Sequence, residues 1–128
     1  MKALRFFVFS FLLTMLAALF STNTTLAQDA VKVDPEHYKV EFENDKVRVL
    51  RITYGPGDKS VMHSHPEGVA VFLTDGFAKM TLPDGTSQEM KPKAGQVIWT
   101  PGDKHQPENI GKEGFEVIQI EFKQTKDE

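Results

Sequence analysis

The sequence contains no cysteine among its 128 residues. Disulfide bonds, thiolate metal ligands and a cysteine nucleophile are therefore excluded, as is lipid attachment at an exported N-terminus. The chain also lacks a Ser-His-Asp order and a phosphate-binding glycine loop. Any chemistry would accordingly depend on a bound metal ion.

An excess of basic residues is absent as well. The full chain carries 15 basic and 18 acidic residues, and loss of Lys2 and Arg5 with a leader would leave 13 against 18, a net charge of −5. Nucleic-acid binding depends on clustered positive charge. The composition therefore gives no indication of a nucleic-acid partner.

The apolar run near the N-terminus is shorter than a membrane-spanning helix. It covers residues 6–20, follows a basic start, and falls below the ~20 residues that spanning requires. Small residues at Thr25 and Ala27 suit cleavage between Ala27 and Gln28. We predict a signal peptide over residues 1–27 and a periplasmic or secreted protein with no membrane association after cleavage. An uncleaved anchor is the alternative.

No sustained helical period follows the leader, and one β-domain is predicted. An N-terminal arm (28–37) leads into a β-barrel (38–122), and a charged tail (123–128) ends the chain. Short alternating segments separated by turn residues are typical of a sandwich or barrel. The expected strands are 38–43, 46–54, 60–65, 69–74, 77–82, 86–91, 96–100, 105–110 and 115–122. In the second, the apolar phase switches between Val49 and Leu50, which indicates a β-bulge or burial on both faces.

Three of the four histidines form a candidate metal site. His63 and His65 are two residues apart, so in a strand both rings leave the same face. His105 follows another expected strand. Three imidazoles can hold a divalent transition ion such as Fe, Mn, Ni, Cu or Zn. A barrel without metal is the alternative, and His37 is expected to be a surface residue.

Two stretches around these histidines resemble the motifs of the cupin superfamily, whose members are double-stranded β-helix, or jelly-roll, barrels. In the first motif, G-x5-H-x-H-x3,4-E-x6-G, Gly57, His63, His65 and Gly76 are in register, and Val69 takes the glutamate position. The resemblance therefore implies a three-histidine site without the family's carboxylate ligand. Glu67 is a candidate substitute because it shares the strand parity of the two histidines.

The second motif, G-x5-P-x-G-x2-H-x3-N, is matched with one residue missing. Gly95, Pro101, His105 and Asn109 correspond, but the interval from proline to histidine is one residue short, and Asp103 stands at the inner glycine. A deletion inside a strand would turn His105 to the wrong face, whereas a loop would absorb it.

A substrate pocket is expected around the metal. The parity of the first motif predicts that Val69 and Val71 point inward beside the histidines, with Trp99 as a wall, although plain core packing is an alternative. Arg51, on the strand before the motif, is a candidate partner for an anionic substrate.

The resemblance leaves two functions open. One is a metal-dependent enzyme acting on a small oxygen-rich, anionic or dicarbonyl-like molecule by dioxygenase, isomerase or lyase chemistry. The other is a non-catalytic module that binds a metal or a ligand. Three neutral ligands leave the charge of the ion uncompensated, which favours an anionic or oxygen-donor ligand in either case. The resemblance also implies a homodimer.

Overall fold

A computed structural model describes residues 28–125 of the chain. The predicted signal peptide and the last three residues of the charged tail lie outside the described residues. In chain order, the elements are α1 (Ala30–Val33), β1 (Tyr38–Glu43), β2 (Val47–Tyr54), β3 (His63–Ser64), β4 (Gly68–Phe72), β5 (Ala78–Thr81), β6 (Ser87–Met90), β7 (Val97–Thr100), β8 (Lys104–Asn109) and β9 (Phe115–Phe122). Between residues 28 and 125, no helix has the length and apolarity needed to cross a membrane.

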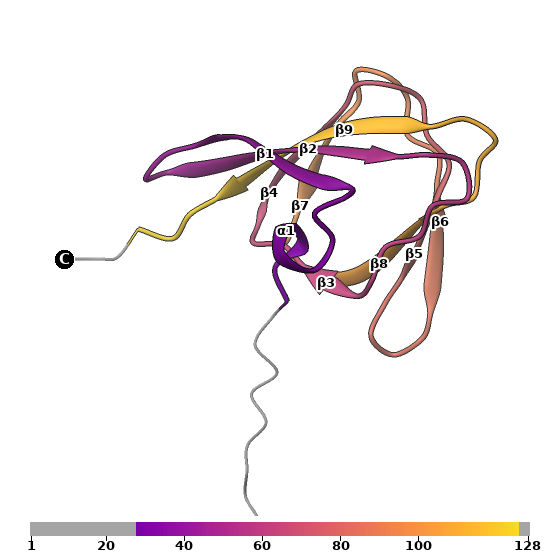
Figure 1. Ribbon diagram of the computed structural model, residues 1–128, viewed down its shortest axis with the longest axis horizontal. Helices are drawn as coiled ribbons and strands as arrows, with labels where there is room; N and C mark the ends of the chain where they lie inside the picture. The colour runs from indigo at the N-terminus through magenta and orange to yellow at the C-terminus, as the bar shows by residue number, and fades with distance from the viewer. Residues whose placement is uncertain (1–27, 126–128) are drawn as a thin grey trace, which may run out of the picture.

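The strands form two sheets that face each other as a barrel (Figure 1). One sheet has the order β1-β2-β9-β4-β7 and the other has the order β3-β8-β5-β6, with antiparallel pairing throughout. Each predicted strand segment overlaps one of these strands, and β4 and β8 begin one residue earlier than predicted. The prediction of an all-β double-stranded β-helix barrel is confirmed.

The barrel core comes mainly from the inner face of the five-stranded sheet. Strands β2, β4 and β9 bury alternate side chains, as the period of two requires. The buried apolar residues on these strands are Leu50, Ile52, Tyr54, Ala70, Phe72, Phe115 and Val117. Apolar side chains on the other face of β2 and β9 are only partly covered, so the sheet is less polar outside than simple alternation predicts.

A β-bulge lies opposite the phase switch seen in the sequence. Val40 pairs with Leu50 and Phe42 pairs with Val49, so Glu41 is the extra residue on β1. The pairing of β2 with β9 is continuous from Val47 to Tyr54. The expected irregularity is therefore present, but it lies on the neighbouring strand, and β2 is regular.

Glycine is required where β4 begins between two neighbours. A Cβ on Gly68 would lie 1.9 Å from the carbonyl oxygen of Ile120, closer than any side chain allows. Gly68 pairs with Thr100 on one side and Glu121 on the other. Close approach of β9 at this point places Glu121 next to the segment that carries the histidines.

Candidate metal centre

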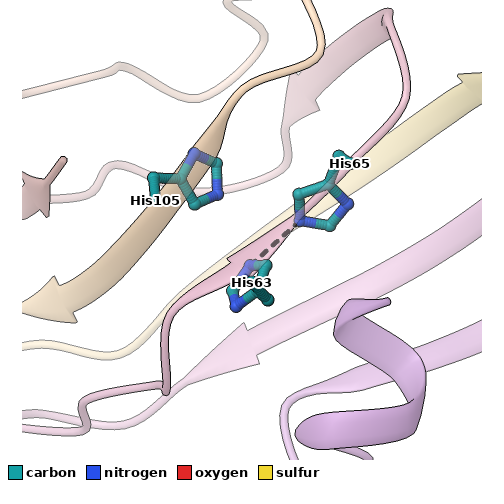
Figure 2. Close-up of side chains that lie close together, drawn as sticks. All are labelled: His63, His65 and His105. Carbon is teal, nitrogen blue, oxygen red and sulfur yellow. Dashed lines mark hydrogen bonds between the residues drawn. The ribbon is translucent and has the colours of Figure 1, made fainter. Parts of the chain in front are cut away.

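The three predicted histidines meet at one place in the barrel. His63 lies in β3 and pairs directly with His105 in β8, and His65 follows β3. One ring nitrogen from each of the three lies within 4.8 Å of those of the other two. Figure 2 shows the three rings turned toward a common space. This convergence depends on the pairing of β3 with β8, two neighbouring strands of the four-stranded sheet that are far apart in the sequence.

The shortened second motif does not displace His105. The missing residue falls in the loop 101–103 before β8, and Gly102 supplies a positive φ of 87°. A Cβ on Gly102 would lie 2.9 Å from the backbone nitrogen of Glu67, so this loop packs tightly on the turn after His65. The loop absorbs the deletion, and the strand register of β8 is kept.

Hydrogen bonds assign the outer nitrogens of His63 and His65 as donors. The Nδ1–H of His63 donates to the carbonyl oxygen of Val61 at 2.8 Å, and that of His65 donates to Oε1 of Glu121 at 2.7 Å. The two Nε2 atoms then face each other at 3.1 Å. Two lone pairs at that distance repel, so a proton or a metal ion must lie between them.

Burial disfavours a positive charge on two of the three rings, His63 and His105. It lowers the pKa of His63 to about 4, with the neighbouring His65 as a further cause. Burial likewise lowers the pKa of His105 to about 3, helped by both other histidines. Near neutral pH these two rings are therefore uncharged, which is the state in which imidazole ligates a metal.

The geometry suits a metal ion held by three neutral nitrogens. Two ligands at right angles, each about 2.1 Å from one ion, are about 3 Å apart, close to the separation of the two Nε2 atoms. Among residues 28–125, the ligand cluster contains no carboxylate. Glu67, the candidate fourth ligand, is exposed on the turn between β3 and β4 and does not belong to the cluster.

A cavity of about 180 Å³ adjoins the histidines. His65 and His105 form part of its wall, together with the phenols of Tyr38 and Tyr54 and the polar side chains of Thr100 and Gln119. The other lining residues are mostly apolar. No Asp, Glu, Lys or Arg among residues 28–125 lines the cavity. An apolar cavity of about 150 Å³ holds a benzene ring, so this one has room for a small ring.

The pocket predicted at Val69, Val71 and Trp99 requires correction. Trp99 is 57% exposed and pairs with Val69 on the outer face, whereas Ala70, between the two valines, is 4% exposed and lines the cavity. The turn after His65 moves the chain from one sheet to the other and shifts the inward parity by one. The position on β4 that faces the site is therefore Ala70, which also offers no ligand atom.

Arg51, the proposed anion partner, also lies on the outer face. Its guanidinium donates to Glu41 at 2.5 Å and lies 3.7 Å from Glu116. Arg48, three residues earlier on β2, is the arginine that reaches the interior. Its Nε donates to Oε2 of Glu121 at 2.6 Å. Because three residues is an odd separation in a strand, the two arginines occupy opposite faces.

The expectation that His37 is a surface residue is wrong. Its side chain is 12% exposed, stacks on Tyr54 at 4.6 Å, and donates from Nδ1 to Asp34 at 2.8 Å and from Nε2 to Asp58 at 3.2 Å. Burial opposes the charge of His37, but the bonds to these carboxylates outweigh it and raise the pKa. His37 bridges two carboxylates, which favour its protonated form.

Raising the pH is expected to remove the stabilising contribution of His37. With a raised folded pKa, this contribution is complete below the unfolded value of about 6.5 and is lost as the pH rises through the folded pKa. Urea unfolding of wild type and His37→Gln between pH of about 5.5 and about 9 measures it, because other titrating groups cancel in the difference. A difference that stays constant or grows with pH would contradict the assignment.

Sequence reasoning missed the buried polar residues around the site. Glu121 is 2% exposed, and Tyr38 and Tyr54, joined by a 2.7 Å hydrogen bond between their phenols, are 2% and 1% exposed. Burial raises the pKa of Tyr54 to about 12 and also raises the pKa of Tyr38 well above its usual range. One signal was present: Gln119 and Glu121 follow Phe115 and Val117 on one face of β9. The opposite face of β9 is more apolar, with Ile118, Ile120 and Phe122, and it concealed this signal.

Solved structures share the fold. A cupin domain from Bordetella pertussis Tohama I is 27% identical, with a TM-score of 0.63 over 68% of this chain and 92% of that one. A protein with a double-stranded β-helix domain from Klebsiella pneumoniae is 24% identical, with a TM-score of 0.53 over 65% of this chain and 72% of that one.

One curated relative matches over a shorter stretch. It is an (R)-mandelonitrile lyase from Granulicella tundricola, 34% identical over 55 residues, which are 42% of this chain and 40% of the relative. The match thus spans less than half of the lyase. No family model matches the sequence. From the barrel topology, the histidine cluster and the similarity to solved cupin domains, the chain belongs to the cupin superfamily.

Proposed function

We propose that this cupin is a metal-dependent enzyme whose ion, held by His63, His65 and His105, binds a small molecule with an oxygen donor and an apolar body. The observation that carries the proposal is the opening of the three-histidine cluster, through His65 and His105, onto an apolar cavity. The ion would supply Lewis-acid polarisation of the bound oxygen. Its identity among Fe, Mn, Ni, Cu and Zn stays a prediction.

The protein side chains around the cavity can donate and orient, but few can accept a proton. Tyr38 and Tyr54 remain protonated at neutral pH, because burial raises their pKa. Gln119 donates to Thr100 at 2.7 Å, which fixes its amide at the cavity wall. Such a lining favours a substrate oriented by its apolar part, and it places the reacting oxygen near the histidines.

Lyase chemistry is the reaction class we favour. The support is the 55-residue similarity to an (R)-mandelonitrile lyase, together with a cavity of the size that holds a benzene ring. In cleavage of a cyanohydrin, the hydroxyl loses its proton, the carbon–carbon bond to the nitrile breaks, and its electron pair leaves with cyanide, which takes up a proton. The carbonyl product retains the oxygen.

The experiment that tests the proposal uses natively exported, untagged protein. Elemental analysis first establishes the metal. The loaded protein is then assayed for release of cyanide and benzaldehyde from mandelonitrile, and for oxygen uptake or isomerisation with β-dicarbonyl and enol substrates. Turnover of mandelonitrile that chelator removes would support the lyase. Turnover only in the oxygen or isomerase assays would replace it by those reaction classes.

A non-catalytic binding module is the second candidate function. The absence of Asp, Glu and Lys from the cavity lining of the described chain favours it, because few groups there can move a proton. This candidate predicts metal-dependent ligand binding without turnover in any of the assays above. Calorimetric titration of the loaded protein with a competitive, non-reacting aromatic alcohol would measure it.

Export and self-association are further parts of the proposal. N-terminal sequencing of exported protein should begin at Gln28 if the predicted cleavage occurs. Sedimentation equilibrium of the same material measures whether the chain forms the homodimer that the resemblance implies.

A further inference from the structure

We infer that the N-terminal arm, residues 28–37, positions the metal ligands His63 and His65 by holding the outer ring nitrogen of each. This inference rests on the proposed metal site. Both histidines of the His-Ser-His segment make hydrogen bonds through Nδ1. The bond from His65 to Glu121 and a second, longer contact from His63 to Ser60 each begin a chain of polar contacts. The two chains end on Asp29 and Asp34, the acidic residues that flank α1.

The first chain runs from His65 to Asp29. Glu121 accepts from His65 through Oε1 at 2.7 Å and from Arg48 through Oε2 at 2.6 Å. The two terminal nitrogens of Arg48 then donate to the two oxygens of Asp29 at 2.8 and 2.9 Å. Burial opposes ionisation of Glu121, but the bonds from His65 and Arg48 outweigh it and lower the pKa.

The second chain runs from His63 to Asp34. The Nδ1–H of His63 lies 3.3 Å from Oγ of Ser60, in addition to its bond to the Val61 carbonyl. The Ser60 hydroxyl donates to Oδ2 of Asp34 at 2.5 Å. Asp34 is held in turn by His37. The hydroxyl therefore links the ring of a metal ligand to the residue that ends α1.

The backbone makes a third attachment between the two histidines. The N–H of Ser64 donates to the carbonyl oxygen of Gln28 at 2.9 Å, and Asp29 forms a parallel bridge with Ser64. Figure 1 shows α1 beside β3. A helix of four residues is not stable on its own, so its place depends on these contacts. Arg48 holds the arm and Glu121 at the same time.

The expected consequence is a metal site whose affinity depends on the arm. Hydrogen bonds to Nδ1 fix the tautomer that leaves Nε2 free, and they fix the ring orientation. Loss of such an outer partner typically weakens metal binding about 10- to 100-fold. Electrostatic repulsion alone predicts the opposite effect for Arg48, because removing a positive charge near a metal ion should tighten metal binding. The sign of the change therefore separates positioning from electrostatics.

The test compares Arg48→Met with Arg51→Met by titration with Co²⁺. Both arginines lie on β2 and bind two carboxylates, but only Arg48 connects to the ligands. We expect Arg48→Met to weaken Co²⁺ binding about 10- to 100-fold and to alter the visible absorption spectrum of the bound ion. Arg51→Met should keep the wild-type affinity and spectrum.

A second variant, Asp29→Asn, separates the arm from Glu121. It leaves Arg48 and Glu121 in place and removes one negative charge of the arm. Loss of that charge alone would also weaken Co²⁺ binding, so the altered spectrum of the bound ion is the result that would support the inference. If Arg48→Met does not fold, Asp29→Asn still tests whether the arm positions the metal ligands. Wild-type Co²⁺ affinity and spectrum in Asp29→Asn would overturn the inference about the arm, and so would tighter Co²⁺ binding in Arg48→Met. Either result would leave the proposed metal site standing. Wild-type protein that binds no Co²⁺ would overturn the proposed metal site together with it.

Discussion

A variant carrying His63→Ala and His105→Ala is expected to contain no metal after purification under conditions in which wild type retains it. The two substitutions remove two of three ligand nitrogens. The remaining ring, His65, should bind an ion more than 100-fold more weakly, since loss of an outer partner alone costs about 10- to 100-fold. Elemental analysis and Co²⁺ titration measure both effects.

Thermal unfolding gives an independent readout of the same prediction. An ion that binds only the folded state stabilises it by about 2.7 kcal/mol at 100 times Kd. For a domain of this size, that corresponds to a rise in Tm of roughly 10–20 °C. Wild type should show this rise on addition of metal and lose it with chelator, whereas the double variant should respond to neither.

The matched control is Glu67→Gln, at the exposed carboxylate on the turn between β3 and β4, which lies outside the ligand cluster. It should keep its metal. Because His63 is fully buried, urea unfolding of the apo double variant must show a cooperative transition before its metal content is interpreted. A folded double variant that still holds stoichiometric metal would contradict the three-histidine site.

Ala70→Leu is expected to abolish ligand binding or turnover while leaving the metal in place. Ala70 is 4% exposed and lines the cavity with His65 and His105. Its replacement adds three carbon atoms to a space of about 180 Å³, which leaves too little room for a ring. Activity or calorimetric affinity should fall at least tenfold, since a lost contact of 1.4 kcal/mol already has that effect.

Val69→Leu is the control for that substitution. It adds one carbon to the neighbouring residue of the same strand, but on the outer face, where Val69 pairs with Trp99. Ligand binding and metal content should both stay at the wild-type level. If Val69→Leu impaired binding and Ala70→Leu did not, the parity originally expected from the motif would be right and the cavity assignment wrong.

The contrast between Val69 and Ala70 shows how far pattern reasoning extends. The sequence correctly predicts the strand and its apolar character. It misassigns the inward residue because the turn at Pro66, Glu67 and Gly68 carries the chain between sheets. Parity is continuous within a strand, but a turn that changes sheets resets it.

The two arginines of β2 illustrate the same limit. Arg48 and Arg51 are indistinguishable by type and lie in a strand that is apolar on both faces. Their binding partners decide which of the two arginines reaches the interior. Arg48 binds Glu121 and Asp29, which lie 73 and 19 residues away in the sequence. The sequence contains no local signal for contacts made at such a separation.

The sequence by itself determined the all-β class, the nine strand segments and the identity of the three histidines, because strand period, turn residues and ligand spacing are local properties. The tertiary structure decided which face of each strand is inside, that Glu67 stays outside the cluster, and that an arginine and two aspartates connect the arm to the ligands. Those features depend on how sheets pack and on which distant residues become neighbours. They arise only when the barrel closes and buried polar groups must find partners.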